Sequence, residues 1–292
     1  MTIIFLIGAI LVVIIAFIFW MHHELDCLET TYYTIESKRL PENFDGVHFA
    51  LLSDLHNKSF GEKNVRLLSA IKRAKPDFIL VAGDMVTAKE KNGSKAGLAL
   101  MEQLGKQYDV FYARGNHEEK LFEIEGAGYE QAVKKMGVYF LNNESVLLSR
   151  GEQSIRITGL SLPLKYFQKF HQTAFPAGQI EELIGKKKGD RFDILIAHKP
   201  AHFPEYVRWG ADFVVSGHVH GGILYLPYFG RVISPQLELF PKFDAGVFTL
   251  DKSTLVISRG LGSHSIPIRI HNRPELVIVT MKKVFSENVS SE

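Results

Sequence analysis

The sequence predicts an α/β fold in which two β-sheets pack against each other between helices, preceded by one membrane-spanning helix. Three features of the 292-residue chain support this fold. Short apolar runs alternate with segments of helical periodicity, as expected when strands are buried on both faces. The C-terminal third has apolar runs with no helix between them, which favours antiparallel pairing and a second sheet. An uncharged apolar segment precedes both parts.

The N-terminal segment, residues 2–20, contains no charged residue and no proline. A helix of this length spans about 28 Å, close to the hydrocarbon core of a bilayer. No basic residue precedes it and no small-residue cleavage site follows it, which favours an uncleaved anchor over a secretory signal. We therefore predict a single-pass protein of the cell membrane. The side of the membrane on which the domain lies is left open. The expected regions are a transmembrane anchor at 1–21, a linker at 22–40 and one domain at 41–285.

The charge and cysteine content exclude some classes of protein. Lys and Arg number 34 against 32 Asp and Glu, a formal net charge of +2, which does not indicate a nucleic-acid-binding surface. Cys27 is the only cysteine, so an intrachain disulfide and a cysteine-based zinc site are both impossible. We expect a monomer that contacts a membrane through its N-terminal helix.

The expected strands and helices follow one another along the domain. Helices are predicted at 64–74, 95–107 and 126–136. Strands are predicted at 47–54, 77–84, 108–116, 156–161, 192–198, 211–218, 243–250, 253–260 and 274–281. Five of the apolar runs finish in Asp, His or Asn. Because ligands of open α/β sheets bind at the carboxyl ends of strands, we expect these polar groups to meet at one edge.

The polar residues at these strand ends are two aspartates, one asparagine and five histidines: Asp54, His56, Asp84, Asn116, His117, His198, His218 and His220. Each element alone is more often an ordinary turn or a buried, hydrogen-bonded residue than a ligand. Together, oxygen and imidazole donors favour Zn, Mn, Fe or Co over calcium. One ion needs three or four ligands, so eight suit two ions that share a bridging ligand.

The spacing within these elements has a physical interpretation. In the Asp-x-His pair at 54–56 and the His-x-His pair at 218–220, strand alternation is expected to turn both side chains to one side. Val219 is expected to point into the core. Gly83 and Gly115 would let the backbone turn tightly into the site.

The order Asp-x-His, Gly-Asp, Gly-Asn-His-Glu, His and Gly-His-x-His resembles the signature of the calcineurin-like metallophosphoesterases. The resemblance covers residues 45–282 and implies a four-layer α-β-β-α sandwich with a dinuclear centre. It implies that one metal is held by Asp54, His56, Asp84 and His220. It implies that the other is held by Asp84, Asn116, His198 and His218, with Asp84 bridging. His117 would lie near the substrate and not on a metal.

The C-terminal segments 258–262, 266–269 and 272–275 resemble the bacterial membrane-associated, YkuE/YaeI-like branch of this family. Val219 and Ile223 depart from the branch, which tends to have a polar residue and a glutamine there. This departure affects the hydrogen bonding around the metals and hence the metal preference.

The resemblance implies hydrolysis of a phosphoester by two divalent transition-metal ions, Mn, Zn or Fe, through a bridging hydroxide. The predicted catalytic residues are His117, Asp84 and Asn116. His117 would protonate the leaving oxygen or stabilise its charge. Arg114 is interpreted either as a phosphate contact or as part of a salt bridge.

The expected substrate is a phosphodiester or pyrophosphate, including one from a lipid or envelope precursor. Two apolar segments, 162–167 and 223–229, are interpreted either as an acyl groove, with Tyr225, Tyr228 and Arg231 at headgroup depth, or as cover for the core. Two other functions stay open: a protein phosphomonoester phosphatase and a non-catalytic scaffold. A serine esterase is excluded because no Gly-x-Ser-x-Gly motif is present.

Overall fold

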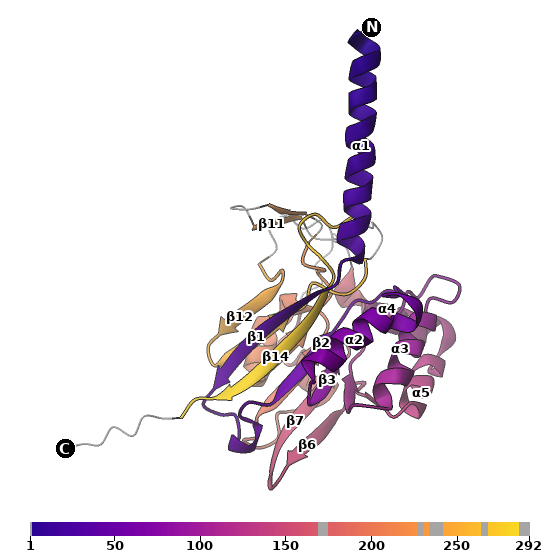
Figure 1. Ribbon diagram of the computed structural model, residues 1–292. Helices are drawn as coiled ribbons and strands as arrows, with labels where there is room; N and C mark the ends of the chain where they lie inside the picture. The colour runs from indigo at the N-terminus through magenta and orange to yellow at the C-terminus, as the bar shows by residue number, and fades with distance from the viewer. Residues whose placement is uncertain are drawn as a thin grey trace, which may run out of the picture.

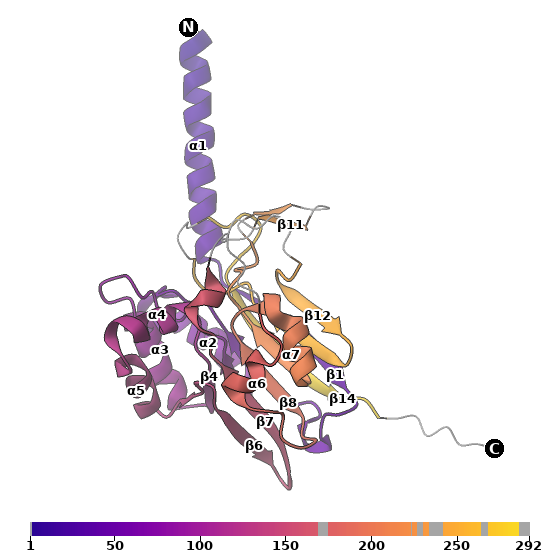
Figure 2. The same ribbon diagram turned by 180° about the vertical axis from the view of Figure 1, so that it is seen from behind.

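The computed structural model describes residues 2–168, 175–222, 224–226, 230–233, 242–263 and 268–285. Its centre is a pair of six-stranded sheets (Figures 1 and 2). The first sheet has the order β1 (Glu29–Ser37), β14 (Glu275–Lys283), β2 (His48–Leu52), β3 (Phe78–Val81), β4 (Val110–Tyr112) and β5 (Tyr139–Phe140). The second has the order β12 (Gly246–Leu250), β13 (Ser253–Ile257), β9 (Phe213–Ser216), β8 (Asp193–Ala197), β7 (Gln153–Leu160) and β6 (Ser145–Arg150).

A helical layer covers the outer face of each sheet. The helices over the first sheet are α2 (Val65–Ala74), α3 (Lys95–Gly105), α4 (Asn116–Glu125) and α5 (Gly128–Lys135). Those over the second sheet are α6 (Gln179–Ile184) and α7 (Phe203–Trp209). The predicted four-layer α-β-β-α sandwich is therefore confirmed. A two-stranded hairpin, β10 (Leu224–Leu226) with β11 (Gly230–Ile233), lies apart from both sheets.

The continuous apolar runs are explained by burial on both faces of each sheet. In β2, Phe49 and Leu51 pack into the core between the sheets. Ala50 and Leu52, which alternate with them, pack against the helices over the first sheet. Because neither face meets water, every second position stays apolar instead of becoming polar.

The N-terminal helix α1 (Thr2–Asp26) is longer than predicted, and the linker expected at 22–40 is not a linker. Only Cys27 and Leu28 separate α1 from β1, which pairs in parallel with β14 over its full length. The run Thr-Thr-Tyr-Tyr-Thr-Ile within β1 consists of β-branched and aromatic residues that favour strands. It is polar because β1 is an edge strand, and this polarity suggested a connector.

The C-terminal third joins both sheets, which differs from its expected place in the second sheet alone. β12 and β13 pair antiparallel in the second sheet, as expected. β14 inserts into the first sheet between β1 and β2 and runs antiparallel to β2. The strands β2, β3 and β4 are mutually parallel, as are β7, β8 and β9. Their carboxyl ends therefore bring the loops after them to a common edge.

Candidate metal centre

The structure brings the predicted site residues together at that edge. Two follow β2, one follows β3, two begin α4 just after β4, one follows β8 and two follow β9. All eight are buried: Asp54, His56, Asp84, Asn116, His117, His198, His218 and His220. Seven of them fall into groups whose ligand atoms lie within 4.8 Å of one another. Asn116 is adjacent to His117, whose backbone N–H donates to Asp84 at 2.7 Å.

One half of the site is a cluster around His220. Its Nε2 lies 3.3 Å from Asp54 Oδ1 and 3.1 Å from His56 Nε2. Its Nδ1 donates a hydrogen bond to Gly262 O at 3.2 Å, which leaves a lone pair on Nε2 of the neutral ring. Burial lowers the pKa of His220 to about 3, so the ring is neutral at pH 7. Tetrahedral ligands about 2.1 Å from one ion lie roughly 3.4 Å apart, so the spacing of these atoms fits a shared cation.

The other half is a cluster around Asp84 and His198. His198 Nε2 lies 3.2 Å from Asp84 Oδ2, and His198 Nδ1 donates to Ala82 O at 2.5 Å. Burial alone would lower the pKa of His198, but the carboxylates of Asp84 and Asp54 outweigh it and raise the pKa to about 10. Without a metal, His198 is therefore protonated at neutral pH. A cation held between His198 and Asp84 would take the place of that proton.

The position of Asp84 connects the two halves. Its Oδ2 faces His198 and also lies 3.9 Å from His56 Nε2, which belongs to the first cluster. Asn116 adds a further candidate ligand atom. Its Oδ1 is buried and has no hydrogen-bond partner among the described residues. A buried carbonyl oxygen without a donor is costly unless something electropositive meets it. The donor set therefore fits a transition-metal centre.

The backbone at the site is not the extended strand expected from the residue spacing. Asp54 and His56 have φ values of 54° and 46°, and His218 and His220 have values of 74° and 50°. These residues lie in the left-handed region, where Asp and His occur more often than most non-glycine residues. The prediction that strand alternation aligns each pair is wrong. Instead, both ligand residues of each pair are left-handed, and the residue between them is not.

Two glycines are required by close contact between neighbouring loops. Gly83 has a φ of 82°, and a Cβ there would lie 2.3 Å from the backbone nitrogen of Gly115. A Cβ on Gly115 would lie 2.2 Å from Asp84 Oδ1. Any side chain at either position would push Asp84 away from the histidines.

Glu118 supports the site by accepting hydrogen bonds from the backbone of the loops that carry it. Its place in the Gly-Asn-His-Glu element did not reveal this role. Its carboxylate accepts hydrogen bonds from the backbone N–H groups of Asp84, Met85 and Gly115, each at 2.8 Å. The Tyr112 hydroxyl donates a fourth bond at 2.6 Å. Glu118 thus holds the loops after β3 and β4 in one arrangement. Burial and the charge of Asp84 raise its pKa, and the hydrogen bonds from Tyr112 and from the backbone of Asp84 and Gly115 oppose this shift.

The segment after β13 fixes the loop that carries His220. Asn272 Nδ2 donates to His220 O at 2.8 Å and to Gly222 O at 2.6 Å. Buried Arg269 donates to the carbonyl of Gly262, which also accepts from His220 Nδ1. The sequence identified this segment as a branch signature but assigned no role to either residue. Of the segment 266–269, positions 266 and 267 lie outside the described residues.

Two other polar side chains take defined positions. Arg114 forms salt bridges with Glu119 at 3.0 Å and Glu130 at 2.6 Å, which supports its interpretation as a salt-bridge residue. His117 Nδ1 accepts a hydrogen bond from Ala88 N–H at 3.2 Å. The neutral ring of His117 therefore carries its proton on Nε2.

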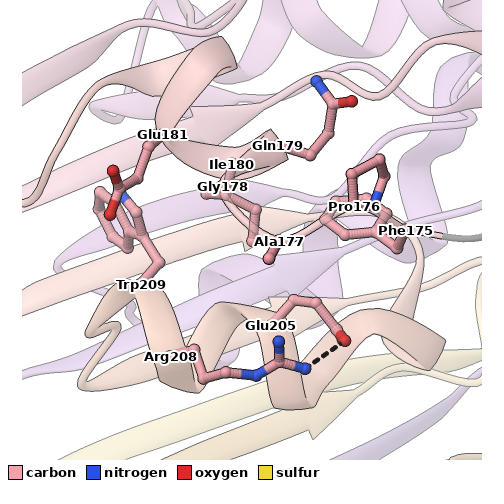
Figure 3. Close-up of a pocket in the computed structure, with 10 residues that line it drawn as sticks. All are labelled: Phe175, Pro176, Ala177, Gly178, Gln179, Ile180, Glu181, Glu205, Arg208 and Trp209. Atoms are coloured by element: carbon pink, nitrogen blue, oxygen red, sulfur yellow. Dashed lines mark hydrogen bonds and ion pairs between the residues drawn. The ribbon is translucent and has the colours of Figure 1, made fainter.

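A separate small pocket lies in the outer helical layer, between α6 and α7 (Figure 3). Its volume is about 60 Å³, and none of the predicted site residues lines it. Within it, Arg208 is paired with Glu205 at 2.5 Å. This pocket is distinct from the metal centre.

The site consists of buried histidines and carboxylates on loops that follow the strands of this fold. This arrangement is that of a metal-dependent hydrolase. Residues 47–222 match the family model described as calcineurin-like phosphoesterase. The chain therefore belongs to the calcineurin-like phosphoesterase family and is a metal-dependent phosphoester hydrolase.

Several bacterial relatives agree with this assignment. The chain is 25% identical to the uncharacterized metallophosphoesterase YkuE of Bacillus subtilis, covering 89% of this chain and 87% of that protein. It is 28% identical to an uncharacterized metallophosphoesterase of Aquifex aeolicus, covering 90% and 95%. It is 23% identical to the phosphodiesterase YaeI of Escherichia coli, covering 79% and 80%. The predicted YkuE/YaeI-like branch is thereby confirmed.

Proposed function

We propose that this protein hydrolyses phosphodiesters or pyrophosphates with two divalent transition-metal ions, Mn, Zn or Fe. The position of Asp84 between the two histidine clusters carries the proposal, because one carboxylate is within reach of both. One ion would be held by Asp54, His56, Asp84 and His220, and the other by Asp84, Asn116, His198 and His218. Bound there, the ions would supply an acidified water as nucleophile and neutralise charge on the phosphoryl oxygens.

His117 would act on the leaving group. Because Ala88 N–H donates to its Nδ1, the ring presents Nε2–H, a hydrogen-bond donor. We assign it to the oxygen that gains charge as the P–O bond breaks. A neutral imidazole is a weak acid, so stabilising that charge is the larger part of its role and full proton transfer the smaller. Asp84 and Asn116 complete the catalytic set by positioning.

The substrate would be amphiphilic and the protein membrane-anchored. Ile4–Asp26 is long and apolar enough to cross a membrane. Leu162 and Tyr166 are buried in the core, but the Phe167 ring packs 5.2 Å from that of His218, so an apolar group borders the centre. The side chains of the second apolar segment, including Tyr225, Tyr228 and Arg231, lie outside the described part of the structure.

The test is a metal-supplemented assay of the purified full chain in detergent. After chelation, Mn²⁺ is added back, and hydrolysis of bis(p-nitrophenyl) phosphate, p-nitrophenyl phosphate and pyrophosphate is compared. We expect diester or pyrophosphate turnover to exceed monoester turnover. Asp84→Asn should remove it, whereas Asp251→Asn, at an exposed turn, should not. A preference for the monoester would favour the protein phosphatase, and no turnover at full metal occupancy would overturn the proposal.

A further inference from the structure

The junction between the apolar helix and the domain is short. α1 ends at Asp26 and β1 begins at Glu29, so two residues connect a candidate membrane span to the edge of a six-stranded sheet. β1 is paired along all nine of its residues with β14. Two residues allow little independent movement, so the orientation of the domain follows that of the helix.

Side-chain contacts reinforce this junction. Buried Glu24 accepts from Arg273 Nε at 2.9 Å, and the Trp20 ring packs 5.5 Å from the His271 ring. Two further contacts join the end of α1 to the domain: Asp26 pairs with Arg66 at 2.7 Å, and Lys58 donates to Leu25 O. We name these four α1 residues, Trp20, Glu24, Leu25 and Asp26, the foot of α1.

The foot of α1 contacts the segments that hold the metal centre. His271 and Arg273 flank Asn272, whose amide donates to the carbonyl of His220. Lys58 lies two residues after His56. α1 and the β10–β11 hairpin lie at the same end of the molecule, whereas the β6–β7 turn lies at the opposite end (Figures 1 and 2). The metal centre is thus at the end from which the apolar helix leaves.

The depth of these contacts follows from helix geometry. The uncharged stretch ends at Trp20, a residue type that is enriched at the membrane–water interface. Glu24 is four residues further, about 6 Å along the helix axis. The polar region outside the hydrocarbon core is roughly 5–7 Å thick on each side. His271 and Arg273 would therefore lie in the headgroup layer, with His220 one hydrogen-bonded residue away.

We propose that the metal-centre end of the domain lies against the surface of the bilayer that holds α1. The substrate is then a phosphoester whose phosphate lies in the headgroup layer of that membrane. This substrate class rests on the proposed phosphoesterase function, but the placement does not. The basic residues near this end already have partners in the foot of α1. Asp26 pairs with Arg66, Glu24 pairs with Arg273, and the Leu25 carbonyl accepts from Lys58. Anionic lipids are therefore not required.

The placement is tested with the full chain in phosphatidylcholine vesicles. Fluorophores are attached at Ile268→Cys, exposed beside Arg269, or at Glu152→Cys in the β6–β7 turn, each with Cys27→Ser. Lipids with a nitroxide on the headgroup serve as quencher. We expect at least several-fold stronger quenching at position 268 than at 152. Equal quenching, or stronger quenching at 152, would overturn the placement whether or not the protein is active.

The substrate class is tested by loosening the junction. A flexible 12-residue spacer between Cys27 and Leu28, combined with Glu24→Ala, gives the domain a reach of about 19 Å. The control carries the same spacer between Gly151 and Glu152. Substrates are bis(p-nitrophenyl) phosphate in solution and hexadecyl p-nitrophenyl phosphate in vesicles.

We expect the spacer at the junction to lower vesicle hydrolysis at least ten-fold while kcat/KM for the soluble diester stays within two-fold. Unchanged vesicle hydrolysis, or an equal loss on both substrates, would overturn the inference. If the unaltered chain hydrolyses neither substrate, the proposed function fails, and the quenching experiment still decides the placement.

Discussion

Replacing Asn272 with alanine removes two hydrogen bonds that hold the backbone beside a proposed metal ligand. The amide nitrogen of Asn272 donates to the carbonyls of His220 and Gly222 at 2.8 and 2.6 Å. Both bonds are buried, and alanine offers no replacement donor. A buried acceptor left without a partner costs about 1–3 kcal/mol. Asn272→Ala is therefore expected to destabilise the fold by a few kcal/mol and to release the loop after β9.

The effect on metal binding should be selective. Loss of a residue that orients a ligand typically lowers metal affinity about 10–100-fold. Because Asn272 donates to the carbonyls of His220 and Gly222, the Mn²⁺ site that contains His220 should weaken by this factor. The other site shares the loop through His218 but keeps its ligands on the loops of Asp84 and His198, so it should weaken less.

Calorimetric titration of the chelated protein with Mn²⁺ measures both affinities. Asn43→Ala is the matched control, because Asn43 also donates through its amide to a carbonyl, that of Arg150, on an exposed surface. If Asn272→Ala weakens neither site, or weakens the site without His220 more strongly, Asn272 does not orient His220.

Three further outcomes are expected. Asp84→Ala should abolish activity and lower bound metal more than any other single ligand substitution, because Asp84 faces both clusters; near-full occupancy by metal analysis would contradict the bridging role. His117→Ala should keep the metals but lose about 10²–10⁴ in rate, with a smaller loss for p-nitrophenol esters than for alkyl esters; equal losses would remove His117 from the leaving group. The raised pKa of His198, about 10, means that Mn²⁺ displaces a proton at neutral pH, so affinity should rise up to ten-fold between pH 7 and pH 8; pH-independent binding would show that His198 is neutral before the metal binds.

The ligand inventory could be predicted because its physical basis is local. Each strand is buried on both faces, so a polar residue such as Asp54 or Asp84 at its end stands out against an apolar run. The four-layer architecture followed from the resemblance carried by these same elements. The left-handed backbone at His56 and His220 was not predictable from spacing alone, because extended and left-handed conformations can both bring residues i and i+2 together.

The supporting residues could not be predicted because their roles depend on distant partners. Arg269 and Asn272 act on the His220 loop, about fifty positions earlier in the chain. Glu118 was visible within a motif, but its four donors come from two separate loops and a strand. β1 was missed for another reason. As an edge strand it exposes side chains such as Tyr32, and its polar composition resembles that of a connector.

The place of β14 has a consequence for how the protein is made. The first sheet has β14 between β1 and β2, so the last strand of the domain separates the first two. Glu29 pairs with Glu275, so most of the sequence lies between these two partners. During synthesis, β1 would emerge next to an inserted helix and wait without a partner until residue 283 has left the ribosome. Such long-range pairing is slow and leaves an edge unpaired, so β1 is a site at which the unfinished chain is open to aggregation and proteolysis.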